Sequence, residues 1–137
     1  MTVLFDTNVL IGAAVPARAH HGAAVRLIAA AERGGIDGLF APSSVATCWY
    51  VAREREGTDP RPLFDLLADV MRVAPMGRSP LRTALQDTQT GDFEDAYLAA
   101  AGAAAGAAAV TTHNEADFRE TPLTPYHPLD LAEMLTG

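Results

Sequence analysis

Short apolar runs alternate along this chain with longer segments in which apolar residues recur every three to four positions. The run "TVLF" ends at Asp6 and is typical of a buried strand, and "DTNVLIGAA" after it predicts a helix. The stretch from His20 to Arg33 places its alanines, leucine and isoleucine on one helical face before a Gly-Gly stop. Further strands are predicted within "IDGLF", "RVAPM", "AAAVTT" and "LTPY". We also expect helices over residues 45–56, 59–71, 80–86 and 92–102 and at the end of the chain.

Strands that alternate with helices predict a parallel sheet covered by helices. The expected fold is therefore α/β, a three-layer sandwich with a central, mainly parallel sheet. A chain of 137 residues suits one domain, and no repeat or linker divides it, so we expect a single domain over residues 1–137. The alanine-rich stretch from Ala99 to Ala109 is expected to pack closely in the core.

Composition narrows the possible functions. The net charge of −7 argues against a protein that grips nucleic acid through a broad basic face. Carboxylates can still hold a divalent cation that bridges to phosphate. All ten basic residues are arginine, which excludes P-loop and Schiff-base chemistry. With one cysteine, no leader sequence and no run long enough to span a bilayer, we expect a cytoplasmic protein without membrane contact.

Acidic residues follow two of the predicted strands. Asp6 comes directly after the first strand, Asp117 lies shortly after the fourth, and Asp92, Glu94 and Asp95 open the helix before that fourth strand. Sites of open α/β sheets lie beyond the carboxyl ends of the strands, so we expect these three segments to converge. Asp92, Asp95 and Asp117 could each instead serve only to cap a helix or complement its dipole.

Asp6 is the strongest candidate for a functional acid. The neighbouring Asn8 is predicted to be the N-cap of the first helix, which leaves Asp6 without a capping role. Burying a carboxylate beside other acids is costly unless the group shares a cation with them.

Three segments resemble the signature motifs of a known family. These are "VLFDTNVLI", "DFEDAYLAAAG" and "VTTHNEADF", and their order and spacing are similar to those of the PIN-domain nucleases, which include the VapC toxins. The resemblance implies a ribonuclease that uses Mg²⁺ or Mn²⁺ held in an acidic pocket. It also implies an RNA substrate, an antitoxin protein as partner and a homodimer.

By position in these motifs, individual residues receive roles from the resemblance. Asp6, Asp95 and Asp117 match the carboxylates that hold metal. The residues matching the polar lining of the pocket are Asn8, Thr112 and Asn114, and His113 stands where the family often has an arginine, which implies a phosphate contact. His20 and His21 are expected to be solvated at the start of a helix, and His127 receives no role.

One family carboxylate is absent. The family usually has a glutamate in the helix after the second strand, but this position falls near Thr47, and no acid occurs between Asp37 and Glu54. Glu54 lies about two helical turns, or roughly 10 Å, further along. The chain also resembles a related branch of PIN-like proteins that has a threonine here and a "DFEDA" block, which implies that Asp92 or Glu94 supplies the missing negative charge. We favour Asp92 as a further catalytic acid, because it projects to the same side of the helix as Asp95, whereas Glu94 is expected to point elsewhere.

Two functions therefore remain open. The first is a metal-dependent ribonuclease, with the toxin of a toxin–antitoxin pair as its specific form. The second is a PIN-like module that has lost activity and binds RNA or protein, for which Thr47 is the supporting observation. A phosphoacceptor receiver domain is excluded because it needs a lysine, and a Rossmann dinucleotide-binding domain because the turn after the first strand is not glycine-rich.

Overall fold

The computed structural model describes residues 1–136, which contain one five-stranded sheet with the strand order β3-β2-β1-β4-β5. All four pairs of neighbouring strands are parallel. The strands are β1 (Thr2–Phe5), β2 (Asp37–Phe40), β3 (Arg72–Val73), β4 (Ala109–Thr111) and β5 (Thr124–Tyr126). Each lies within one of the five segments predicted to form strands, and the predicted α/β fold with a parallel sheet is confirmed.

Seven α-helices connect these strands within the described residues, together with one π-helix and one 3₁₀-helix. The α-helices are α1 (Thr7–Ala14), α2 (His21–Glu32), α3 (Pro42–Trp49), α4 (Arg61–Val70), α5 (Arg78–Gln86), α6 (Phe93–Ala104) and α7 (Pro128–Thr136). The π-helix η1 (Tyr50–Arg55) continues α3, and the 3₁₀-helix η2 (Glu115–Phe118) follows β4.

The helix predicted over residues 45–56 differs most from the structure. It begins earlier, at Pro42, because proline is well suited to the first turn of a helix, where its missing N–H is not needed. It also changes to π-helical hydrogen bonding at Tyr50, and the N–H of Glu56 donates to the carbonyl of Val51. No helix in the described residues is long and apolar enough to cross a membrane.

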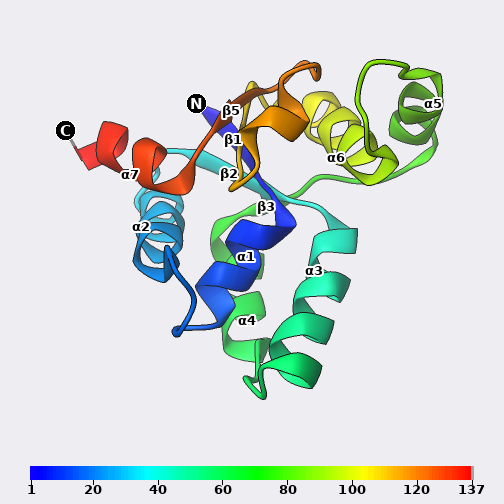
Figure 1. Ribbon diagram of the computed structural model, residues 1–137. Helices are drawn as coiled ribbons and strands as arrows, with labels where there is room; N and C mark the ends of the chain where they lie inside the picture. Colours follow the sequence, from blue (N-terminus) through cyan, green and yellow to red (C-terminus); the bar gives the residue numbers. More distant parts are fainter. Residues whose placement is uncertain (137) are drawn as a thin grey trace.

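Side chains that alternate along β1 divide the core into two layers. Val3 and Phe5 face one cluster, which includes residues of α1, α2, α3 and α7, and Leu4 faces the other, which includes residues of α6. Figure 1 shows the same division, with α5 and α6 on one side of the sheet and α1 to α4 on the other. The sheet is thus the middle layer of a three-layer sandwich, as predicted.

The strand order reverses at β1, which places a crevice at the carboxyl ends of β1 and β4. From β1 the chain moves towards β2 and β3 on one side, and β4 and β5 lie on the other. Phe5 is paired with Thr111, and the N–H of Asp6 donates to the carbonyl of Thr111 at 3.0 Å. The residues that follow both strands are therefore aligned at the position where open α/β sheets bind ligands.

Candidate functional site

Asp6 directly follows β1 at this edge of the sheet and is 7% exposed. One carboxylate oxygen accepts a hydrogen bond from the N–H of Thr7 at 2.8 Å, and the other accepts one from the hydroxyl of Thr112, also at 2.8 Å. Burial raises the pKa of Asp6, and the charges of Glu94 and Asp117 raise it further, while the two hydrogen bonds lower it. The structure thus holds a carboxylate in an environment that disfavours its charge.

Asp6 is also the N-cap of α1, which corrects the prediction that Asn8 has this role. Instead, the side-chain oxygen of Asn8 accepts a hydrogen bond from the N–H of His113 at 3.3 Å. The Thr112 hydroxyl accepts one from the N–H of Asn114 at 3.0 Å. Asn8 and Thr112 therefore join the segment after β1 to the segment after β4 and fix the position of Asp6.

Asp95 approaches from α6 and is half-buried. Its pKa is raised to about 7, first by burial and then by the charges of Asp6, Asp92, Asp117 and Glu94. Three segments that are far apart in the sequence therefore bring carboxylates within electrostatic reach of one another. A carboxyl group with a strongly raised pKa close to other acids is typical of functional sites.

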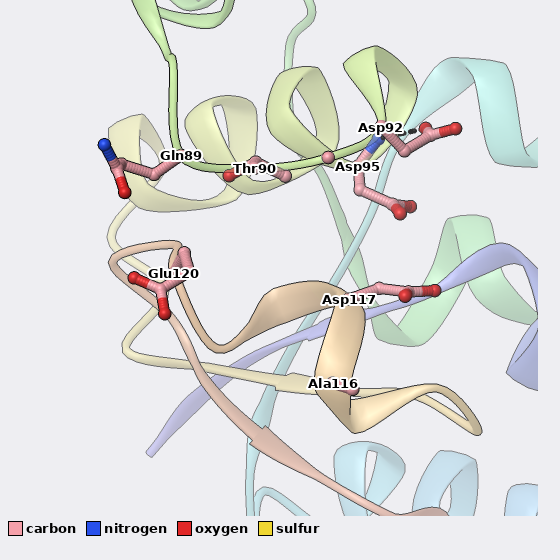
Figure 2. A pocket seen from close by; sticks show the side chains of 8 residues that line it. Gln89, Thr90, Asp92, Asp95, Ala116, Asp117 and Glu120 are labelled. Atoms are coloured by element: carbon pink, nitrogen blue, oxygen red, sulfur yellow. Dashed lines mark hydrogen bonds between the residues drawn. The ribbon is translucent and has the colours of Figure 1, made fainter.

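A pocket of about 440 Å³ opens beside these acids. In Figure 2 the side chains of Asp92, Asp95 and Asp117 extend in the same direction, and Gln89 and Glu120 lie at the opposite end of the pocket. The complete lining consists of Gln89, Thr90, Gly91, Asp92, Asp95, Ala116, Asp117 and Glu120. The pocket is thus formed between the start of α6 and the 3₁₀-helix η2.

Asp87 orders the loop that forms one wall of this pocket, a role that sequence reasoning missed. Its carboxylate accepts hydrogen bonds from the N–H groups of Gln89 and Thr90 and from the Thr90 hydroxyl, at 2.7–2.8 Å. These hydrogen bonds lower the pKa of Asp87, so the carboxylate keeps its charge. An aspartate followed by short polar residues is a turn signal that could have identified it.

Asp92 lines the pocket on the same side as Asp95, where it was predicted to project, and it also has the capping role that was its alternative (Figure 2). Asp92 is the N-cap of α6 and accepts a hydrogen bond from the N–H of Asp95 at 3.0 Å. The charge of Glu94, predicted to point elsewhere, raises the pKa of both Asp6 and Asp95. Glu94 and Asp92 are therefore both part of the acidic cluster, which here means Asp6, Asp92, Glu94, Asp95 and Asp117.

The PIN-domain family model matches residues 2–116 of this chain. The chain belongs to the PIN-domain family. PIN domains are typically nucleases and generally use divalent metals. No curated protein and no solved structure shows a match. The family match includes Asp6, Glu94 and Asp95 and ends one residue before Asp117, whose place in the site comes from the pocket geometry.

Near the position of the missing family glutamate, this PIN domain has a hydrogen bond between two uncharged hydroxyl groups. Thr47 is exposed on α3 and does not line the pocket. One turn earlier, the buried Ser44 shares a hydrogen bond of 2.7 Å with the hydroxyl of Thr7 at the start of α1. Helix α3 thus supports the helix that Asp6 caps, but it brings no carboxylate into the cluster.

The donor chemistry of the acidic cluster suits a hard divalent cation. Among residues 1–136, no three His, Cys, Asp or Glu side chains are gathered closely enough to hold one ion directly. Mg²⁺ usually keeps several water ligands and binds through only one or two carboxylates. A cation bound partly through water would offset the repulsion that raises the pKa of Asp6 and Asp95.

His113, predicted to contact substrate, is half-buried and is not part of the pocket lining. Its ring lies 5.4 Å from that of His20 and 5.6 Å from that of His127, measured between ring centroids. His20 is exposed, as expected, and its ring also lies beside that of His113. His127, which received no role from the sequence, is half-buried and its ring stacks near that of His113. His21 is half-buried and its Nδ1 lies 2.8 Å from the carbonyl oxygen of Gly12.

Proposed function

We propose that this PIN domain is a metal-dependent ribonuclease that hydrolyses RNA phosphodiester bonds. The observation that supports it most is the acidic cluster at the carboxyl ends of β1 and β4. Burial and the neighbouring acids raise the pKa of Asp6 and of Asp95, and keeping both carboxylates charged costs stability unless a cation is bound. The pocket beside the cluster, of about 440 Å³, has room for substrate groups.

The residues of the site divide into ligands and positioning groups. Asp6, Asp95 and Asp117 would hold Mg²⁺ or Mn²⁺, directly or through water, and Glu94 adds negative charge beside them. When bound, the cation would neutralise the charge that develops on the scissile phosphate and would activate a water molecule. Thr112 and the N–H of Thr7 fix the orientation of the Asp6 carboxylate through their hydrogen bonds.

Asp95 is the group best suited to accept a proton from the attacking water. The pKa of Asp95 is about 7 in the metal-free protein, and a bound cation would lower it, so Asp95 would be ionised in the loaded site and able to act as a base. In its ionised form, Asp95 would accept a proton from the water that attacks in line with the leaving oxygen. No covalent intermediate with the protein is needed for this hydrolysis.

Cleavage of RNA in the presence of Mn²⁺ tests the proposal. Wild-type protein should cleave a mixed RNA substrate with Mn²⁺, and a chelator should stop the reaction. Asp6→Asn should abolish cleavage because it removes the most buried carboxylate of the cluster. Glu133→Gln changes an exposed acid on α7 and serves as the control with unchanged activity. Equal cleavage by wild type and Asp6→Asn, or cleavage that a chelator does not affect, would contradict the proposal.

The alternative function is a module that binds RNA or protein without cleaving. Two observations favour this alternative. Thr47, near the position of the family glutamate, is exposed, and among residues 1–136 no three His, Cys, Asp or Glu side chains lie close enough to bind one metal ion. Mn²⁺ binding without turnover on any RNA would support this alternative.

The toxin role, the antitoxin partner and the homodimer stay predictions based on the motifs. A protein encoded beside this chain that binds it and inhibits cleavage would support the toxin role. Sedimentation of the purified protein would test the homodimer.

A further inference from the structure

Three histidines from separate parts of the chain meet next to the acidic cluster. His20 precedes α2, His113 follows β4 and His127 precedes α7. The distances between ring centroids are 5.4 Å for His20 and His113, 4.7 Å for His20 and His127, and 5.6 Å for His113 and His127. We call these three residues the histidine cluster.

The backbone connects the histidine cluster to the acidic cluster. Thr112 donates its hydroxyl hydrogen bond to Asp6, and the next residue, His113, donates its N–H to Asn8. A strand of RNA whose scissile phosphate lies at Asp6 could therefore place a neighbouring phosphate at the histidines.

The histidine cluster contains a polar atom that has no partner within the protein. The Nε2 atom of His113 is buried and makes no hydrogen bond. A buried polar group without a hydrogen-bond partner destabilises a protein, so a missing ligand is a physical explanation for it. His20 makes no side-chain capping bond to α2, and Nδ1 of His127 already accepts from the N–H of Leu129 at 3.2 Å.

His20 adopts a strained conformation at this place. Its φ of 66° makes it the only non-glycine residue with positive φ in the part of the chain that the structure describes. Such a conformation is unfavourable for a residue with a side chain, and strained residues of this type concentrate at ligand-binding positions.

The electrostatic environment of the histidine cluster favours an anion. After burial, the groups that lower the pKa of His113 are His127, His20 and Arg18, all of them basic. Arg18 and His20 come from the segment between α1 and α2, and His127 from the segment before α7; no acid acts on His113 from these elements. Arg18 is paired with Glu56 at 3.0 Å, which offsets part of its charge. An anion would relieve the repulsion among these groups.

We propose that His20, His113 and His127 form a subsite that binds an RNA backbone phosphate next to the scissile phosphate. This rests on the proposed ribonuclease function. A transition metal does not fit the cluster, because no three potential ligands in residues 1–136 are arranged to hold an ion. A phosphate accepts N–H hydrogen bonds from imidazole and binds more strongly when the ring is protonated. RNA affinity should therefore increase as the pH falls.

Binding of a short fluorescent single-stranded RNA tests the subsite when EDTA is present and no cleavage occurs. The test variant is the triple substitution His20→Asn, His113→Gln and His127→Asn. Asparagine tolerates the left-handed conformation at position 20, and at position 127 it can retain the bond to the Leu129 N–H. The matched control is His21→Gln, which changes a neighbouring histidine outside the histidine cluster.

Wild type and the His21→Gln control should bind the RNA about tenfold more tightly near pH 6 than near pH 8. The triple variant should bind more weakly than wild type near pH 6 and lose most of this difference, while protonation of Asp95, whose pKa is about 7, leaves a smaller pH dependence in both proteins. Equal affinity and equal pH dependence in the triple variant and wild type would overturn the proposal.

A second measurement on the wild type does not depend on how the variant folds. Added inorganic phosphate should shift the imidazole NMR signals of the three clustered histidines, and not those of His21, and should compete with the RNA. Shifts without competition would show a free-phosphate site and overturn an RNA subsite, and the absence of shifts would overturn both. Because binding is measured without metal, its outcome is separate from Mn²⁺-dependent cleavage, whose loss in Asp6→Asn tests the ribonuclease function.

Discussion

The side chain of Thr112 donates a hydrogen bond to Asp6, the buried acid of the site. The neighbouring Thr111 provides an internal comparison. Both threonines are fully buried. The Thr112 hydroxyl donates to Asp6 at 2.8 Å, whereas the Thr111 hydroxyl has no hydrogen-bond partner. Of these two adjacent threonines, Thr112 therefore makes a side-chain hydrogen bond to Asp6 and Thr111 makes none.

Thr112→Val should lower the free energy of unfolding by about 1–3 kcal/mol, because it leaves a buried carboxylate oxygen without its donor. Thr111→Val should be close to neutral or stabilising, because it removes a buried polar atom that has no partner. Urea denaturation of both variants measures the difference. Equal destabilisation by the two substitutions would show that the bond to Asp6 is unimportant.

Asp95 should make the stability of the metal-free protein depend on pH. Its pKa is about 7 in the folded state against a model value of 3.8, so the folded state binds the proton more strongly. The free energy of unfolding should therefore decrease as the pH rises from about 4 to about 7. Asp95→Asn should remove this component and be more stable than wild type above pH 7.

The gain from Asp95→Asn should be only about 1 kcal/mol, because solvent screens a half-exposed carboxyl group. Denaturation in EDTA across this pH range is the measurement. A variant that is less stable than wild type above pH 7 would contradict the account of Asp95.

At the residue scale, the sequence identified the acids but not all of their contacts. Asp6 was predicted because Asn8 was assigned the capping role and because burying a carboxylate beside other acids is costly without a cation; the first premise was wrong, since Asp6 itself caps α1. The side-chain oxygen of Asn8 could have served as a cap, but it contacts the N–H of His113, 105 positions away. Glu94 was dismissed from helical spacing alone, which does not describe the reach of a long side chain at the first turn of a helix.

At the scale of elements, the close packing of α6 on the sheet depends on small residues. Ala99 and Ala101 are buried, which agrees with the prediction for this alanine-rich segment. A Cβ atom on Gly102 would meet Leu4 at 3.0 Å and Leu123 at 3.3 Å. Gly12, in the buried part of α1, has nothing within 4 Å of the same position.

Gly102→Ala should therefore lower the free energy of unfolding by about 1 kcal/mol, since the overpacking cost exceeds the gain in helix propensity. Gly12→Ala should raise it by up to about 1 kcal/mol, because only the propensity changes. Thermal or urea unfolding of the two variants compares them. A stabilising Gly102→Ala would show that α6 can move away from the sheet without cost.

The elements themselves could be predicted because their apolar periodicity is local information. All five strands and the longer helices follow from it. The π-helix at Tyr50–Arg55 and the 3₁₀-helix at Glu115–Phe118 could not be predicted, because tertiary packing rather than residue type selects these hydrogen-bonding patterns. The meeting of His20, His113 and His127 was also beyond prediction, since it depends on how separate loops pack.

At the scale of the whole molecule, the fold places two clusters of opposite chemistry side by side. The chain carries a net charge of −7, and its acidic cluster would repel RNA without a cation. The histidine cluster gathers basic groups one residue beyond Thr112. The sheet order explains this arrangement, because β1, β4 and β5 are neighbours and end at the same edge.

Calorimetric titration of Mn²⁺ into the metal-free protein tests most directly whether the acids of the cluster share a cation. Wild type and the surface control Glu133→Gln should bind Mn²⁺ with the same affinity, and Asp6→Asn should bind it at least about tenfold more weakly. Binding by wild type should weaken as the pH falls below about 7, because protons compete for Asp95. Equal Mn²⁺ affinity in wild type and Asp6→Asn, or no binding by either, would contradict the account.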